Sequence, residues 1–111
     1  MYNRGNIERE ILKAARNENP RNLAKIVGLC VDVETKIRAL NELEKLALTR
    51  HRRALEEKEF VIGTMLSSAG LAKKMVPQPP RELFLAFARV IAAFENLKRE
   101  NPYPKAESII K

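Results

Sequence analysis

Apolar residues recur every three or four positions over most of this chain, which is the spacing of the buried face of an α-helix. The first such stretch starts after Asn6, a residue type that caps helices, and continues to about Asn17. Its predicted buried side consists of Ile7, Ile11, Leu12 and Ala15. A second, short helix is predicted from Pro20, with Asn19 as its cap, to Gly28.

The third stretch is the longest, because the helical spacing continues from Asp32 to Gly70 with no proline in between. An unbroken helix of roughly 37 residues would be about 55 Å long, which exceeds the width of a compact domain of this size. The polar segment from Thr49 to Arg53 would then lie where little core could cover it. We therefore expect this helix either to project from the domain or to break near Gly63.

A connector with prolines at positions 77, 79 and 80 separates the third helix from the last one. The last helix is the most regular, with apolar residues at alternating steps of four and three, and it is predicted to end at Asn101–Pro102. Such a stripe usually packs into the protein's own core, but its width also suits a surface shared with another subunit. The predicted partner interface consists of Leu83, Phe84, Phe87, Val90, Phe94 and Leu97.

No stretch alternates between apolar and polar residues as a half-buried strand does. The pattern therefore predicts an all-α, bundle-like fold of about four helices with one very long central helix. Residues 1–101 would form a single helical domain, and residues 102–111 would form a C-terminal tail.

Basic residues outnumber acidic ones by 21 to 14, which gives the 111-residue chain a net charge of +7. The excess lies at the two ends, since residues 31–69 have seven residues of each sign. This balance favours an anionic partner, either a nucleic acid or an acidic protein. No apolar run approaches the roughly 20 residues that span a bilayer, so we expect no membrane contact and a cytoplasmic location, with association with the nucleoid left open.

Two groups of basic residues are candidates for nucleic-acid binding through phosphates. They are Arg50, Arg52 and Arg53 in the predicted long helix, and Lys73 and Lys74 in the connector. Glu56 and Glu57 lie four residues after two of the arginines and could neutralise them, as on an ordinary solvated helix. The two lysines have no close acidic neighbour and are the cleaner candidates.

Residue types with catalytic or metal-binding chemistry are too scattered to predict a site. Cys30 is the only cysteine and lies between apolar residues, so we expect a buried thiol and neither a disulfide nor a thiolate metal site. His51 is the only histidine, and no glycine-rich phosphate loop or nucleophile triad accompanies it. We therefore predict a protein that is not an enzyme and that has no catalytic residue, metal or cofactor.

Two segments resemble the helical domain of the GINS family, whose members are non-catalytic subunits of the replicative helicase complex of archaea and eukaryotes. Residues 43–55 contain leucines followed by closely spaced basic residues, and residues 79–94 begin with two prolines, continue as Glu82-Leu83-Phe84 and end in an apolar run. The family's small β-domain has no predicted counterpart here. The resemblance implies a subunit whose helices pack against sister subunits while its basic ends face DNA or an acidic partner.

Three functions are compatible with these observations. The leading prediction is a non-catalytic helical subunit of a nucleic-acid-associated assembly, like a DNA replication factor of the GINS type, that forms homo- or hetero-oligomers. The alternative is a stand-alone DNA- or RNA-binding protein, such as a small regulator or the small subunit of a CRISPR effector. The third is an adaptor between proteins that makes no contact with nucleic acid.

Overall fold

The computed structural model describes residues 4–29 and 32–97, and most of these residues are helical. The helices are α1 (Arg4–Arg16), α2 (Pro20–Val27), α3 (Val33–Leu48), α4 (Arg52–Glu56), α5 (Lys58–Lys73) and α6 (Arg81–Glu95). The described residues contain no strand, so the predicted all-α class is confirmed. Cys30, the predicted helix end at Asn101–Pro102 and the predicted tail at 102–111 lie outside the described residues, and α6 itself already ends at Glu95.

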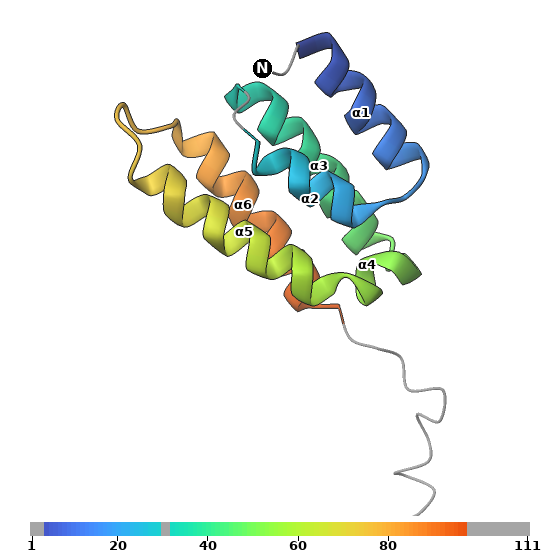
Figure 1. Ribbon diagram of the computed structural model, residues 1–111. Helices are drawn as coiled ribbons and strands as arrows, with labels where there is room; N and C mark the ends of the chain where they lie inside the picture. Colours follow the sequence, from blue (N-terminus) through green and yellow to red (C-terminus); the bar gives the residue numbers. More distant parts are fainter. Residues whose placement is uncertain (1–3, 30–31, 98–111) are drawn as a thin grey trace, which may run out of the picture.

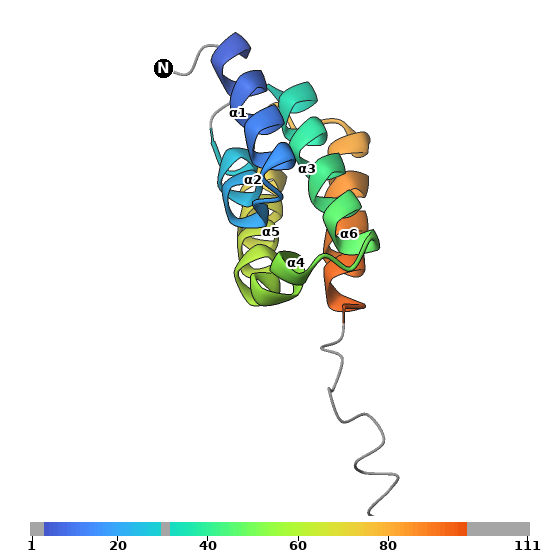
Figure 2. The ribbon, with the colours of Figure 1, turned by 90° about the vertical axis from the view of Figure 1, so that its right-hand side faces the viewer.

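The helices are stacked in three layers (Figures 1 and 2). The middle layer consists of α2 and α3, and α1 packs against both of them on one side. On the other side α5 packs against α2, and α6 packs against α3. α5 and α6 also pack against each other as a hairpin whose connecting segment is residues 74–80. α1 and α5 therefore lie on opposite sides of the molecule.

The apolar stripe of α6, with Leu97 just beyond the helix, lies in the core. Five of the residues predicted as a partner interface are at most 5% exposed, namely Leu83, Phe87, Val90, Phe94 and Leu97. Phe84 is half-buried against the same core. Because the chain's own helices cover these side chains, the interpretation of the stripe as a partner interface is corrected: it is core.

The predicted central helix is three helices, so that prediction is wrong. The chain turns at residues 49–51, whereas Gly63 lies inside α5 and Gly70 does not end it. The turn reverses the chain, so that α5 returns along α2 and α6. Apolar residues from both halves of the segment, such as Leu43 and Met65, thereby reach the same core. One straight helix could not have buried both.

α1 buries a narrower stripe than the sequence predicts. Ile7, Ile11 and Ala14 are at most 4% exposed, while Leu12 is 64% exposed and Ala15 is half-buried. Positions 7, 11 and 14 face α2 and α3, and position 12 is turned well away from them at about 100° per residue. The outer side of α1 is thus free for polar and charged residues.

Candidate nucleic-acid interface

The basic residues predicted to bind phosphates lie in two separate places. Arg50, Arg52 and Arg53 lie at the corner between α3 and α4, whereas Lys73 and Lys74 lie where α5 ends, near the tip of the α5–α6 hairpin. These places are at opposite ends of the long axis of α5 (Figure 1). The structure therefore does not bring the two groups together.

The corner after α3 is built in the same way as the corner after α1. Glu18 and Arg50 both have a φ of 53°, in the left-handed region. The backbone N–H of the following residue donates to the carbonyl of Ala14 in the first corner (2.8 Å) and to that of Leu46 in the second (3.1 Å). This bond is characteristic of the Schellman ending of a helix, whose left-handed position usually holds glycine. Arginine at that position gives no stop signal in the sequence.

The residue after each left-handed position caps the next helix. The Asn19 side chain accepts a hydrogen bond from the backbone N–H of Asn22 at 3.1 Å, as the sequence predicts. In the other corner the His51 Nδ1 accepts from the backbone N–H of Arg53 at 3.1 Å. Each corner therefore ends one helix and starts the next with only three residues between them.

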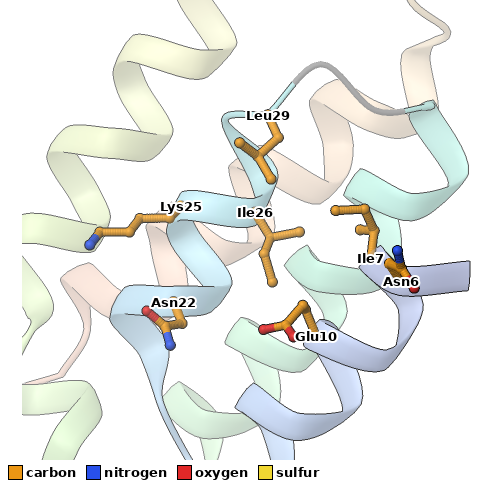
Figure 3. Close-up of a pocket in the computed structure, with 7 residues that line it drawn as sticks. All are labelled: Asn6, Ile7, Glu10, Asn22, Lys25, Ile26 and Leu29. Atoms are coloured by element: carbon orange, nitrogen blue, oxygen red, sulfur yellow. The ribbon is translucent and has the colours of Figure 1, made fainter. Parts of the chain in front are cut away.

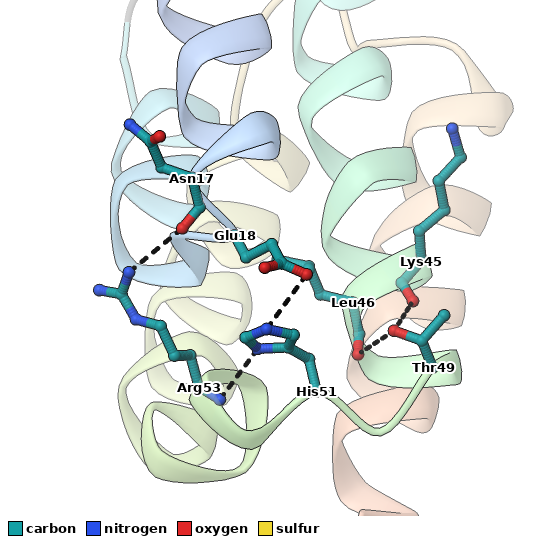
Figure 4. A network of polar contacts seen from close by, with 7 residues as sticks. All are labelled: Asn17, Glu18, Lys45, Leu46, Thr49, His51 and Arg53. Atoms are coloured by element: carbon teal, nitrogen blue, oxygen red, sulfur yellow. Dashed lines mark hydrogen bonds and ion pairs between the residues drawn. The ribbon is translucent and has the colours of Figure 1, made fainter.

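The two corners contact each other (Figure 4). The His51 Nε2 lies 3.1 Å from a carboxylate oxygen of Glu18, and the Arg53 guanidinium donates to the Asn17 carbonyl at 3.3 Å. Because Nδ1 accepts a hydrogen bond, the imidazole hydrogen is on Nε2 and is donated to Glu18. The histidine therefore joins the α1–α2 turn to α4, and Arg53 is held against the end of α1.

Only part of the predicted neutralisation of the arginines occurs. Arg52 pairs with Glu56 at 3.5 Å, and both side chains are more than half exposed. The predicted pair between Arg53 and Glu57 is wrong, because Glu57 pairs with Arg21 at 2.8 Å. Arg21 also lies over a phenylalanine ring of α5, which fixes the guanidinium on α5. Arg53 is therefore left without a carboxylate partner among the described residues.

α1 carries three further cations that the sequence analysis missed, and we call them the α1 cationic face: Arg9, Lys13 and Arg16. All three are exposed and lie opposite the buried side of α1. No carboxylate in the described ranges lies within ion-pair distance of any of them. Together with Leu12 and Asn17 they line a shallow hollow of about 390 Å³. Their i, i+4, i+7 spacing, opposite the apolar stripe, is a signal that could have identified them.

The α1 cationic face continues into the corner at α4. Asn17 lines the hollow, and its backbone carbonyl accepts the hydrogen bond from Arg53, so Arg53 extends the row of charges beyond the end of α1. Arg50 is exposed beside it, and Glu18 contributes one carboxylate, which His51 holds. The α1 cationic face and Arg53 together are called the α1–α4 cationic band.

The second predicted group remains a smaller cluster. Lys73 and Lys74 are exposed and, in the part of the chain that the structure describes, have no carboxylate within ion-pair distance. Arg81 is exposed at the start of α6, across the connector from them. Phosphate binding by these residues stays a prediction.

A groove of about 620 Å³ lies between α1 and α2 (Figure 3). Its lining combines apolar and polar side chains, which are Asn6, Ile7, Glu10, Asn22, Lys25, Ile26 and Leu29. Ile7 and Ile26 lie between the two helices, while the Lys25 ammonium points away from the groove toward α5. Since its charged groups do not converge, the groove does not form a second anion site.

Residues suited to metal binding are scattered in space as well as in sequence. Within residues 4–29 and 32–97, no three His, Cys, Asp or Glu side chains gather as a metal site requires. None of the helices in these ranges has the length and apolar character needed to cross a bilayer. The surface feature that stands out is thus the α1–α4 cationic band.

No protein-family model, curated protein or solved structure matches this chain. The resemblance to the GINS family therefore stays a prediction, and function has to be inferred from the chemistry of the surface.

Proposed function

We propose that this protein is a non-catalytic helical protein that binds the phosphate backbone of double-stranded nucleic acid through the α1–α4 cationic band. One observation carries the proposal: the three cations of the α1 cationic face lie on one side of one helix and have no carboxylate partner among the described residues, whereas several cations elsewhere have one. Arg38, Lys45 and Arg89 pair with glutamates at 3.0, 3.2 and 3.5 Å. Unpaired cations in a row attract a polyanion more strongly than cations that are already neutralised.

The spacing of the row suits a phosphate backbone. Arg9 and Arg16 are about 10 Å apart along the helix axis, a length over which one strand of a duplex presents about three phosphates. Lys13 lies between them, and Arg53 follows beyond Arg16 through its bond to the Asn17 carbonyl. The row of cations is therefore long enough to contact about three phosphates of one strand at the same time.

The aromatic side chains favour duplex over single-stranded nucleic acid. Proteins that bind single strands stack exposed aromatic rings on the bases. In this protein Phe87 and Phe94 are buried, and Phe60 and Phe84 are half-buried against the core. No aromatic ring among the described residues is largely exposed, so this part of the chain favours contact with phosphates over base stacking. Binding of this kind does not depend on base sequence.

The test is a titration of a fluorescent 20-base-pair duplex with the full chain, followed by anisotropy from about 25 to 200 mM salt. The triple variant Arg9→Gln/Lys13→Gln/Arg16→Gln should bind more weakly. Its slope of log affinity against log salt should be shallower by about 2.7, because each lost phosphate contact removes about 0.9 from the slope.

The matched control is Lys73→Gln/Lys74→Gln/Arg81→Gln, which removes the same charge from the tip of the α5–α6 hairpin. We expect its slope to stay close to that of the wild type. A larger loss in this control than in the α1 variant would assign binding to the lysines and overturn the role of the band. Failure of the wild type to bind duplex at low salt would overturn the proposal in favour of the adaptor function.

A subunit role in a nucleic-acid-associated assembly, as the resemblance to GINS implies, is the second candidate. It is supported by apolar side chains that the described chain leaves uncovered, since Leu66 and Leu71 on α5 are 56% and 67% exposed. Stable co-purification of sister subunits from the native host, with weak duplex binding by the isolated chain, would favour this function.

A further inference from the structure

No described helix covers the outer side of α5, and several large apolar side chains are exposed around it. The large apolar side chains exposed on α5 and directly after it are Leu66 (56%), Leu71 (67%), Met75 (52%) and Val76 (95%). A Cβ added to Gly63 or Gly70 would meet no atom within 4 Å, so the helix backbone is also open there. Leu66 and Leu71 lie on opposite flanks of this side, about 140° apart around the helix. Exposed large apolar side chains beside an uncovered helix face are typical of a surface that contacts another molecule.

The residues of this outer face are arranged symmetrically about its midpoint. Six positions project within an arc of roughly 100° opposite the buried side of α5, and they are Glu59, Gly63, Leu66, Ser67, Gly70 and Lys74. The midpoint lies between Leu66 and Ser67. Glu59 and Lys74 are equally far from it in opposite directions, and so are the two glycines. A two-fold rotation about this midpoint would therefore bring the position of Glu59 onto that of Lys74, which has the opposite charge.

We propose that α5 is the interface of a homodimer in which the α5 helices of two copies pack antiparallel, with the two-fold axis between Leu66 and Ser67. This arrangement places Glu59 of each copy beside Lys73 and Lys74 of the other, so opposite charges meet twice. The glycines allow close approach of the two backbones, and Leu66 of each copy packs beside the axis against Ser67 of the other. A two-fold contact between identical copies requires a surface that is complementary to itself, whereas a contact with an unrelated partner has no such requirement.

Neither charge of the outer face is used within the chain. Glu59, Lys73 and Lys74 form no ion pair with any described residue, so they are available to a second copy. The face lies on the opposite side of the molecule from α1. The homodimer is therefore independent of the proposed function and can be tested without nucleic acid.

Sedimentation equilibrium of the full chain from about 5 to 500 µM is the first measurement, because a single helix pair is a small interface with modest affinity. We expect a monomer at the low end and a dimer at the high end. Leu66→Glu should abolish the dimer, since each copy would bury a carboxylate without a cationic partner beside the axis. Leu48→Glu is the matched control, because Leu48 is 68% exposed at the end of α3, and it should dimerise as the wild type does.

Charge reversal tests the antiparallel direction. Glu59→Lys alone, or Lys73→Glu/Lys74→Glu alone, should weaken dimerisation about tenfold, because two attractive contacts become repulsive. An equimolar mixture of the two variants should regain wild-type affinity, since each copy then supplies the missing sign. All three residues are exposed, and circular dichroism verifies that the variants fold. A monomer at every concentration, or a dimer unaffected by Leu66→Glu and by both charge reversals, would overturn the proposal.

Discussion

Arg50→Gly tests the corner that replaces the predicted long helix, because its effect on stability has opposite signs in the two arrangements. In the structure Arg50 has a φ of 53°, and a residue with a Cβ in the left-handed region loses about 1–2 kcal/mol relative to the right-handed one. Glycine removes this penalty but loses about 0.5–1 kcal/mol more backbone entropy on folding. The free energy of unfolding should therefore increase by about 0.5–1 kcal/mol.

Urea denaturation followed by circular dichroism measures this change directly. With a slope of roughly 1–3 kcal/mol per molar urea, the midpoint should rise by about 0.2–1 M while the slope stays constant. If α3 instead continued through position 50 as one helix, the glycine would lie inside a helix and lower the stability by about 1 kcal/mol. A lower midpoint would thus refute the broken helix.

Arg50→Ala is the control for the loss of the guanidinium, since alanine keeps a Cβ in the left-handed region. We expect the glycine variant to be more stable than the alanine variant. In an uninterrupted helix the alanine variant would be the more stable of the two, because alanine is the better helix former.

Substitutions at two further positions test the packing of the core and the cap of α4. Phe87→Ala should lower the free energy of unfolding by about 3–5 kcal/mol, because the ring is 2% exposed and leaves a cavity, and an unchanged urea midpoint would show that α6 is placed wrongly. His51→Ala should lower the free energy of unfolding by about 1 kcal/mol, because it removes the cap of α4. His51→Asn should keep most of this stability, because asparagine also caps helices. Equal losses in both histidine variants would contradict a capping role.

Local signals in the sequence predict part of the fold correctly. Asn19 followed by Pro20 marks the start of α2, because both the cap and the fixed φ of proline act within the segment itself. The regular stripe of α6 likewise predicts a helix with one buried side. It does not tell which molecule buries that side, and the structure assigns it to the chain's own core.

The corner after α3 and the contacts between distant residues could not be predicted, because no local sequence pattern contains them. Arg50 takes the position that glycine usually occupies at a helix end, so the apolar period runs through the corner without interruption. The contact between Glu18 and His51 joins residues far apart in the sequence, and it exists only because both corners turn toward each other. The α1 cationic face was predictable from spacing alone, whereas the partners that Glu57 and Arg53 take are set by packing.

The layered arrangement has a consequence for the energetics of α1. This helix is buried through Ile7, Ile11 and Ala14 and packs mainly against the middle layer, so it can detach without opening the interface between the other two layers. Such partial opening costs less than global unfolding. A polyanion that binds the attached helix would suppress the open state, and part of its binding energy would be measured as slower amide hydrogen exchange in α1. The outermost layer would then report ligand occupancy while the core stays unchanged.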